Sequence, residues 1–428
     1  MPSAETNKPG GRTATTTPEF SRRPLDRKSE IADNAGRLFS RHGFHAVRMD
    51  DIAAESGITA RALYRHYRNK KALLSFVIRQ DQDRVLKALR EAHSRDASLD
   101  DVIEALTISA LTTPHLGVLW QREARHLELE DLATTRSGTR ELAHLVQAAI
   151  FRENPSVDPF KAEVRAYSTL SIVTSAGYYE ARMPQRHLHR LIAAACQASV
   201  STVTGPSHQN DAPRSAASDR PSHRVPTSRR EQLINAAALA LRRHGFGGTS
   251  IDDFGADISL VGPGIYRYFE NKASVLLTVI SRFHEWVTYE TYRALAETAD
   301  DDDVLRALVR AYIQVAAAAL DLHAVTITES LELTNGPAEV MSRQRADHLA
   351  EWQRWLATAR PDLSDRVVHA LATAARTMVD DLARIPHLWG NPSFPDELTE
   401  TTLSVLYDTV IEHMDAPSPA GESGVDAE

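Results

Sequence analysis

The sequence predicts an all-α protein made of two similar halves, and three observations support this fold class. Apolar residues recur three and four positions apart along most of the chain, which is the spacing of one face of a helix. No segment shows a convincing alternation of apolar and polar residues, so no strand is expected. Residues 41–74 recur 202 positions later as residues 243–276, with twelve of thirty-four positions identical and no gap. A repeat of this length indicates a duplicated module.

Three polar stretches divide the chain. Residues 1–24 are rich in Thr, Pro, Gly and Ser and lack apolar periodicity, which is typical of a disordered arm. Residues 205–227 have the same character and are expected to form a flexible linker, and residues 416–428 a short tail. The predicted domains are therefore residues 25–204 and 228–415.

Each domain opens with an amphipathic segment that predicts a helix. Apolar residues at i, i+4, i+7 and i+8 begin at Ile31 in the first copy and at Leu233 in the second. Both segments end in Arg-His-Gly. Gly43 and Gly245 suit the left-handed residue that follows a helix end, and the basic residues before them complement the helix dipole.

The repeated segment contains a helix-turn-helix pattern. Residues 50–58 predict a short helix that ends in a glycine turn, and Thr59 is placed to cap a second short helix over residues 60–67. Leu63 would face the core, whereas Ala60, Arg61, Tyr64 and Arg65 would face outward. A helix of this size fits the major groove of DNA, where Arg pairs with guanine. Tyr64, His66 and Lys70 would lie near phosphate oxygens. Together with about twenty preceding residues, this pattern predicts a three-helix unit at about 27–73 and again at 229–275.

The charge is unevenly distributed between the two copies. The net charge of −8 argues against a uniformly basic coat, but DNA contact needs only a local patch. Residues 59–71 contain five Lys and Arg and no acid, whereas residues 261–273 contain Arg267 and Lys272 beside Glu270. The first copy is therefore the more basic of the two.

The second copy departs from the pattern at its turn. Ser259 stands where the first copy has Gly57, and a non-glycine residue in a left-handed turn costs about 1 kcal/mol. Val261 replaces the capping Thr59, which removes an interaction of about 1 kcal/mol. A helix that begins one residue later, with Gly262 as the cap and Pro263 at the first helical position, would relieve this second loss. The second module is expected to fold but to recognise DNA more by shape and phosphate contact.

Both copies resemble the DNA-binding domain of TetR-family transcriptional regulators. In the first copy the resemblance rests on Gly43-Phe44, Asp51-Ile52-Ala53, Ser56 to Thr59, Leu63 to Tyr67 and Asn69-Lys70; in the second it rests on Gly262 to Phe269 with Asn271-Lys272. The segments DRKSEI, GITARALYRHYRNKKALL and VLWQREARHL are also similar to single-chain tandem TetR regulators of mycobacterial mammalian-cell-entry operons.

The resemblance implies two TetR-like domains in tandem. Each would consist of three N-terminal DNA-binding helices and a bundle of about six helices that forms a ligand chamber and a dimerisation face. The implied partners are a double-stranded DNA operator and a small hydrophobic effector of the lipid, sterol or acyl-CoA class. The implied DNA-binding residues are Arg48, Thr59, Ala60, Arg61, Tyr64, His66 and Lys70 in the first copy, and Thr249, Ser250, Gly262, Pro263, Tyr266, Tyr268 and Lys272 in the second.

A second repeated feature lies on a central helix of each half. Residues 120–127 and 326–333 look equivalent, and Glu123 then matches Glu329. These acids, with Trp120, are candidate ligand-binding residues of a chamber. Alternatively, each acid pairs with a neighbouring arginine.

Two pairs of apolar helices are candidates for the contact between the halves. They are residues 160–179 with 187–200, and residues 365–382 with 397–414. The alternative is that they belong to the core of each domain, and both roles are compatible. The chain would then act as a monomeric pseudo-dimer on an asymmetric operator, because covalent joining replaces association of two chains.

Other classes of function find less support. The chain has no Gly-x-Ser-x-Gly, phosphate-binding glycine loop or zincin motif, so it is not expected to be an enzyme. The single Cys196 excludes an internal disulfide and multi-cysteine metal sites, and neither a metal nor a cofactor is expected. No apolar run of eighteen residues or secretory leader is found, which predicts a cytoplasmic, nucleoid-associated protein without a membrane partner. The remaining alternative is that only the first helix-turn-helix binds DNA and the second is a docking or dimerisation scaffold.

Overall fold

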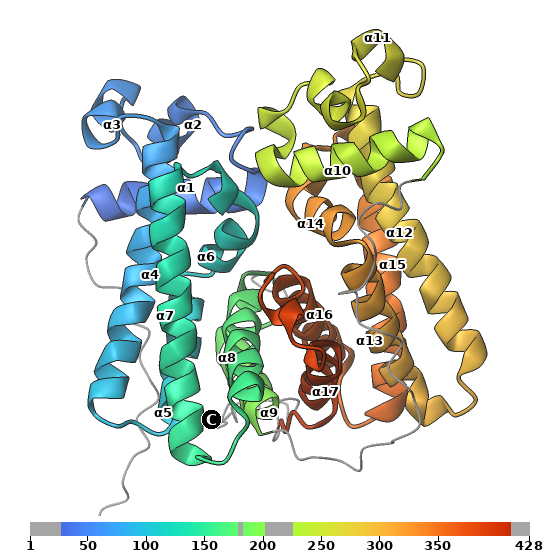
Figure 1. Cartoon of the computed structure of the whole chain (residues 1–428). Helices are drawn as coiled ribbons and strands as arrows, with labels where there is room; N and C mark the ends of the chain where they lie inside the picture. Colours follow the sequence, from blue (N-terminus) through green and yellow to red (C-terminus); the bar gives the residue numbers. More distant parts are fainter. Residues whose placement is uncertain (1–26, 179–182, 202–225, 412–428) are drawn as a thin grey trace, which may run out of the picture.

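The computed structural model describes residues 27–178, 183–201 and 226–411, and these residues form helices and no strand (Figure 1). The all-α prediction is therefore confirmed for this part of the chain. The predicted arm and tail, and the predicted linker up to residue 225, lie outside the described residues.

The described residues form two similar series of helices. The first series is α1 (Arg27–His42), α2 (Met49–Glu55), α3 (Ala60–His66), α4 (Lys70–Ser94), α5 (Leu99–Thr112), α6 (His115–Val118), η1 (Leu119–Glu123), η2 (Ala124–His126), α7 (Leu129–Glu153), α8 (Pro159–Thr174), η3 (Ser175–Tyr178) and α9 (Gln185–Val200). The second series is α10 (Arg229–Gly248), η5 (Asp252–Phe254), η6 (Ala256–Ile258), α11 (Gly262–Ile265), α12 (Lys272–Glu297), α13 (Asp301–Ala318), α14 (Leu320–Glu329), η7 (Ser330–Glu332), α15 (Asn335–Ala359), α16 (Asp365–Leu382), η8 (Leu388–Gly390) and α17 (Phe394–Tyr407).

The structural repeat extends well beyond the segment that the sequence comparison detects. Helices α4 and α12 begin 202 residues apart, at residues 70 and 272, and α5 and α13 begin at residues 99 and 301 with the same offset. Helices α7 and α15 begin at residues 129 and 335, and α8 and α16 at residues 159 and 365, so the offset there is 206. An insertion of four residues before α15 therefore separates the two parts of the repeat.

Four helices at the centre of the molecule join the two halves. Helix α8 packs against α16, and α9 packs against α17 (Figure 1). These four helices make up the two pairs that the sequence suggested for this contact, α8 with α9 and α16 with α17. The last helix ends at Tyr407, earlier than the predicted residue 414, and residues from 412 onward lie outside the described part.

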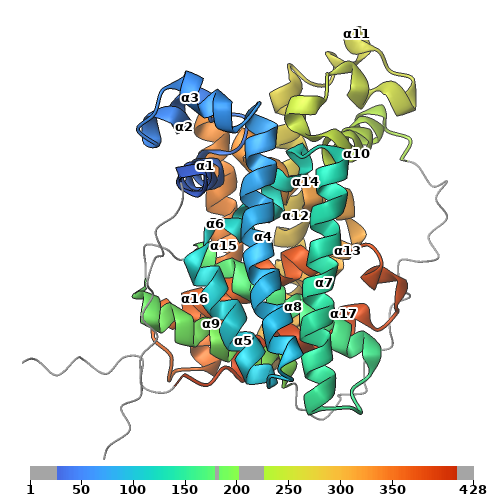
Figure 2. The same ribbon diagram turned by 90° about the vertical axis from the view of Figure 1, so that its left-hand side faces the viewer.

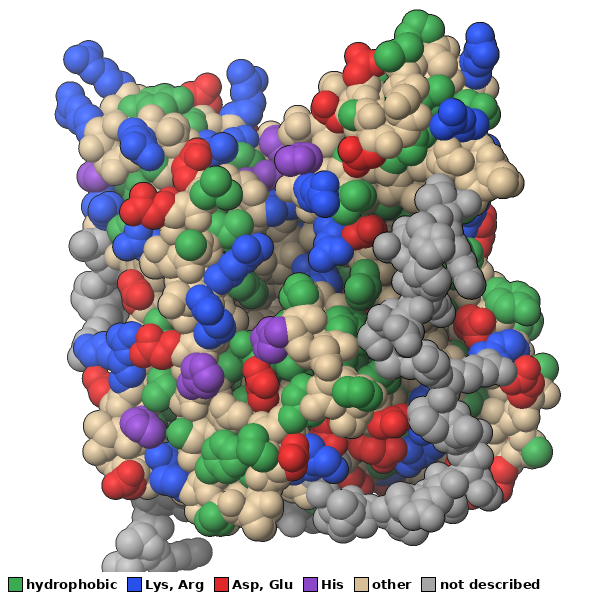
Figure 3. Space-filling model, viewed as in Figure 1, with side chains coloured by type: hydrophobic (Ala, Val, Ile, Leu, Met, Phe, Trp, Pro, Cys, Tyr) green, Lys and Arg blue, Asp and Glu red, His purple; other side chains and the backbone are tan. Residues whose placement is uncertain are grey.

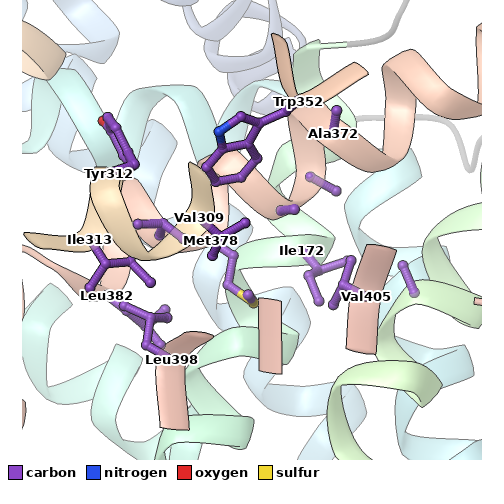
Figure 4. Close-up of a cluster of buried hydrophobic side chains, with 14 of the residues drawn as sticks. Ile172, Val309, Tyr312, Ile313, Trp352, Ala372, Met378, Leu382, Leu398 and Val405 are labelled. Carbon is purple, nitrogen blue, oxygen red and sulfur yellow. The ribbon is translucent and has the colours of Figure 1, made fainter. Parts of the chain in front are cut away.

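The apolar core continues from one half into the other. Ile172 of α8 belongs to the same buried cluster as Val309, Trp352, Met378 and Val405 of the second half (Figure 4). These side chains are all at most 3% exposed. Since burial of such side chains contributes about 1.5–3 kcal/mol each, the two halves stabilise each other.

Buried polar contacts also cross between the halves. The guanidinium of Arg165 lies 3.2 Å from the carboxylate of Glu397, and Lys161 lies 3.4 Å from the same carboxylate. Arg165 and Glu397 are 8% and 6% exposed. On a second patch, Asp381 accepts hydrogen bonds from Gln121 at 2.8 Å and from the hydroxyl of Ser171 at 2.5 Å.

Residues 115–126, which precede α7, form three short helical pieces. Helix α6 leads into a π-helical turn, η1, and a 3-10 turn, η2, before α7 begins at Leu129. Gly117 permits α6 to pack closely on α8, because a β-carbon there would lie 2.5 Å from the β-carbon of Thr174. The break turns Glu123 toward the N-terminal helices.

By length and composition, no single described helix qualifies to cross a membrane, although two bent helix pairs meet the test jointly, residues 99–112 with 115–126 and residues 301–318 with 320–332.

Candidate nucleic-acid interface

Two small helical units stand at the same end of the molecule (Figures 1 and 2). We call residues 27–69 the first head and residues 226–271 the second head. Two segments are called the neck turns. The first, residues 43–47, connects α1 to α2, and the second, residues 245–249, begins at the kink of α10 at Gly245 and leads to η5. In both neck turns the glycine has a positive φ, +81° at Gly43 and +72° at Gly245, which confirms the predicted left-handed residues.

The first head has the predicted helix-turn-helix geometry. Gly57 makes the turn with a φ of +62°, and the hydroxyl of Thr59 accepts the N–H of Ala62 at 3.2 Å. Leu63 is fully buried and holds α3 against the small core of the head. Arg48 lies at the N-cap of α2, where its backbone N–H donates to Asp51 at 2.8 Å and its side chain is exposed.

Helix α3 presents a basic, carboxylate-free surface. Its exposed side chains are Thr59, Arg61, Tyr64, Arg65, His66 and Arg68, and Ala60 is half-buried beside them. Figure 3 shows Lys and Arg side chains that project from this end of the first half. The spacing of Arg61, Tyr64 and Arg65 places them on one helical face, which is the arrangement that suits base edges and phosphates.

Long-range contacts hold this surface in place. Asn34 of α1 donates to the hydroxyl of Ser56 at 3.1 Å, and Arg27 donates to the Ser56 carbonyl at 2.8 Å. The hydroxyl of Tyr67 donates to the carbonyl of Lys28 at 3.0 Å. These contacts join residues 22 to 39 positions apart, so the sequence pattern gave no direct signal for them.

Two lysines predicted to contact DNA bind backbone carbonyls of the neck turns. The amine of Lys70 donates to the carbonyls of Phe44 at 2.7 Å and Val47 at 2.8 Å, and it lies 4.4 Å from the centre of the Phe44 ring. Lys272 donates to the carbonyl of Phe246 and lies 4.2 Å from that ring. Burial lowers the pKa of both amines. Each lysine therefore supplies a hydrogen-bond donor to carbonyls of its neck turn, where the helical hydrogen-bond pattern ends.

The second head is reduced by comparison. The counterpart of α2 consists of two 3-10 turns, η5 and η6, and α11 has only four residues, against seven in α3. Ser259 has a φ of +55°, which confirms the predicted left-handed turn at a non-glycine residue. Val261, not Gly262, occupies the cap position, and no side chain caps the helix. The predicted shift of the helix start is therefore wrong.

Only part of the predicted surface of the second head is exposed. Pro263, Tyr266 and Tyr268 are exposed, as is Ser250, whose hydroxyl donates to Asp253 at 2.7 Å. The two remaining predicted DNA contacts of this head, apart from Lys272, are buried: Gly262 and Thr249.

These two residues are buried for different reasons. A β-carbon at Gly262 would lie 2.8 Å from a carboxylate oxygen of Asp252, so a larger residue there would require this exposed side chain to move. The hydroxyl of Thr249 donates to the carbonyl of Gly245 at 3.1 Å, inside the neck turn.

The candidate ligand-binding acids also contact the neck turns. Glu123 accepts the N–H of Phe44 at 3.1 Å, and Glu329 accepts the N–H of Phe246 at 2.9 Å. Burial raises the pKa of Glu123, while Arg122 acts in the opposite direction. Trp120 lies half-buried against the core of the first head. The role of these three residues in a chamber stays a prediction. The alternative of pairing with a neighbouring arginine holds for both acids, since Glu123 lies 3.9 Å from Arg122 and Glu329 forms an ion pair with Arg125.

The first head matches a known family of proteins. The family model described as "Bacterial regulatory proteins, tetR family" matches residues 31–76, which include all of α2 and α3. The similarity to this family is therefore located in the first head and the start of α4.

Curated relatives of this TetR-family domain are also transcriptional regulators. The HTH-type transcriptional regulator UidR of Escherichia coli K12 is 33% identical over 79 residues, which are 18% of this chain and 40% of UidR. The HTH-type transcriptional repressor KstR2 of Rhodococcus jostii RHA1 is 30% identical over 105 residues, which are 24% of this chain and 52% of KstR2. The chain thus spans about half or less of the length of these relatives.

Several solved structures are similar to part of the chain. A TetR-family regulator from Bordetella parapertussis 12822 has a TM-score of 0.40 and 20% identity, and it covers 44% of this chain and 97% of its own. AibR, solved in complex with isovaleryl coenzyme A and operator DNA, has a TM-score of 0.33 and 20% identity, with 40% of this chain and 97% of its own covered.

Proposed function

We propose that this TetR-family regulator is a repressor that binds an asymmetric operator with both heads, as an intramolecular pseudo-dimer. The observation that carries the proposal is the exposed, carboxylate-free surface of α3, which lies at the same end of the molecule as α11. The continuous core across α8, α9, α16 and α17 supports a fixed arrangement of the two heads. In the cell this role would place the protein on the nucleoid, in the cytoplasm.

The two heads would make unequal contributions to recognition. Arg61 and Arg65 on α3 are long and exposed, and Arg at such positions pairs with guanine edges. Helix α11 offers Tyr266 and Tyr268, whose hydroxyls suit phosphate oxygens. We infer that the first head specifies the sequence, whereas the second fixes the register on the duplex.

Binding to the DNA upstream of the gene tests the proposal. Arg61→Ala is expected to lower affinity about 5- to 150-fold, since a good base contact is worth about 1–3 kcal/mol. Arg366→Ala is the matched control, because it removes the same charge from an exposed position on α16. Affinity should fall steeply with salt, with a slope of about −0.9 per phosphate contact. Salt-independent binding, or equal losses in both variants, would contradict this interface.

A second candidate role applies to the second head alone. Its one-turn α11 and its exposed acids, Asp252, Asp257 and Glu270, favour a docking or dimerisation scaffold over a DNA contact. The Tyr266→Ala variant separates the roles. A weaker complex and a shortened footprint support DNA contact, whereas full affinity supports the scaffold.

We further propose a response to a small hydrophobic effector of the lipid, sterol or acyl-CoA class, with target genes in lipid or sterol metabolism or transport. Support for the effector class comes from the sequence resemblance. A candidate region is a buried cluster around Asp380 in the second half. The Asp380 carboxylate accepts a hydrogen bond from the hydroxyl of Tyr312 and lies 3.0 Å from His323. The guanidinium of Arg376 stacks 3.3 Å from the centre of the Tyr312 ring. Burial by itself would raise the pKa of Asp380, but Arg376 and His323 outweigh it and hold this pKa well below its usual range.

The first half lacks this cluster at the equivalent positions. Counted with the offset of 206, Gly117 and Thr174 stand where the second half has His323 and Asp380, and they pack in direct contact. The effector proposal predicts that octanoyl-CoA or cholesterol releases the protein from DNA. The effector concentration that gives half-maximal release should rise at least about tenfold in Arg376→Met, because the guanidinium would pair with the polar group of the effector. Release that is equal in both chains would exclude this cluster.

A further inference from the structure

Each neck turn is touched by the opposite half of the chain. A β-carbon at Gly245 would lie 3.7 Å from the guanidinium carbon of Arg125, and one at Gly43 would lie 3.8 Å from the side chain of Leu331. Arg125 and Leu331 are equivalent positions, since each follows its neck-turn glutamate by two residues. The contact is therefore reciprocal and follows the approximate twofold relation of the halves.

The two reciprocal contacts differ in chemistry. Arg125 forms an ion pair with Glu329, and that carboxylate also accepts the N–H of Phe246 in the second neck turn. The side chain of Glu329 is fully buried, and that of Arg125 is 20% exposed. Leu331, in contrast, can offer Gly43 only an apolar contact. The second neck turn is therefore tied to the first half through a buried charge pair, and among the described residues no ion pair of this kind joins the first neck turn to the second half.

A third contact joins the two neck turns directly. A β-carbon at Gly247 would lie 2.6 Å from Nε2 of His45, so the imidazole of the first neck turn rests directly on the backbone of the second. The His45 ring packs edge-on against His126 at 4.5 Å, and His126 stacks on Phe44 at 4.9 Å. Figure 3 shows histidine side chains at the base of the gap between the two heads.

We propose that Arg125 is the positioning residue that fixes the separation of the two heads, and with it the spacing of the half-sites that the chain accepts. A tilt of the second head would pull the N–H of Phe246 away from the Glu329 carboxylate, which Arg125 of the first half holds in place, and loss of that buried hydrogen bond is unfavourable in a site of low polarity. This inference rests on the proposed function, because head separation matters for an operator only if both heads bind it.

A measurement without DNA tests the positioning itself. Ala54 and Ala256 are equivalent, exposed positions on the two heads, and spin labels on Ala54→Cys and Ala256→Cys would report the distance between them. Cys196 is fully buried and can stay in place. A single narrow distance distribution is expected in the parent chain, and a broadened one in Arg125→Met. An unchanged distribution in Arg125→Met would overturn the inference.

Operators with altered spacing test the consequence. One base pair inserted between the half-sites moves them apart by about 3.4 Å and rotates them by about 35°. The parent chain should lose at least about tenfold in affinity for the altered site, whereas Arg125→Met should lose less than about threefold. Equal losses in the two chains would overturn the inference. If the parent chain binds neither site, the proposed function fails, and the distance measurement still decides the role of Arg125.

Further variants separate positioning from folding. Glu329→Gln keeps an acceptor for the Phe246 N–H but removes the charge, so it should resemble Arg125→Met in both experiments. The double variant should add no further loss of spacing preference, because both changes break the same tie. Arg125→Lys retains the cation and should restore most of the preference, and Leu331→Met should leave it unchanged. Additive effects, or no rescue by lysine, would show that Arg125 acts only through general stability.

Discussion

Replacement of Lys70 by methionine distinguishes a structural lysine from a phosphate-binding one. The amine donates to the carbonyls of Phe44 and Val47 at 2.7 and 2.8 Å and lies over the Phe44 ring. A hydrogen bond to a charged group contributes about 1.5–3 kcal/mol, and a cation–π contact at a partly exposed site adds about 0.5–1 kcal/mol. Water can reach part of this half-buried site, so we expect Lys70→Met to destabilise the first head by about 2 kcal/mol.

Hydrogen exchange of peptides from residues 27–69 measures this loss in the intact chain, because it reports local opening of the head. Lys71→Met is the matched control: Lys71 is exposed and pairs with Glu128 at 3.1 Å, and such surface pairs contribute about 0–1 kcal/mol. The salt dependence of DNA binding should stay the same in Lys70→Met, since no phosphate contact is lost. A salt slope reduced by about one, with unchanged hydrogen exchange, would refute the structural role.

Three further predictions follow from other features of the fold. Ser259→Gly should stabilise the second head by about 0.4–1 kcal/mol by relieving a left-handed residue, and Gly57→Ala should destabilise the first head by about 1 kcal/mol; urea unfolding measures both. Burial lowers the pKa of His284 to about 4 and that of His348 to about 3, below the value of about 6.5 in an unfolded chain. Stability should therefore fall as the pH drops from about 6.5 to 4, by up to about 1.4 kcal/mol per pH unit for each ring, and less steeply in His284→Gln. Arg165→Met should destabilise the contact between the halves by about 3 kcal/mol, because it leaves a buried carboxylate with only a partly exposed lysine; thermal unfolding measures this loss.

Each of these predictions has a clear contrary outcome. A serine turn as stable as its glycine variant would show that the left-handed residue carries no strain. Stability that is constant between pH 6.5 and 4 would mean that the two histidines do not stay neutral in the folded chain. An Arg165→Met chain with the parent's melting temperature would mean that the ion pair contributes nothing net.

The features that the sequence predicted well are local ones. Helical periodicity, the left-handed Gly43, the Thr59 cap and the left-handed Ser259 all depend on residues within four positions of each other. The physical preferences of these residue types decide such features directly. For this reason the strain in the second turn was visible without a structure.

The roles of Lys70 and Glu123 could not be obtained in this way. Their partners lie 26 and 79 residues away, and both partners are backbone atoms, which carry no residue type for the sequence to reveal. Repetition in both halves showed that these positions are constrained. It did not show whether the constraint is a ligand, a phosphate or a carbonyl, and the structure assigns it to the backbone of the neck turns.

The ion pair between Arg165 and Glu397 favours pairing of the first half with the second half over pairing of two identical halves. Counted from the start of each helix, Arg165 corresponds to Leu371 of α16, and Glu397 corresponds to Leu188 of α9. If two first halves met through this surface, Arg165 would face Leu188 and remain buried without a carboxylate, which costs about 3–5 kcal/mol. Two identical halves are thus poor partners for each other, and a gene cut down to either half would lose the complementary surface along with the second head.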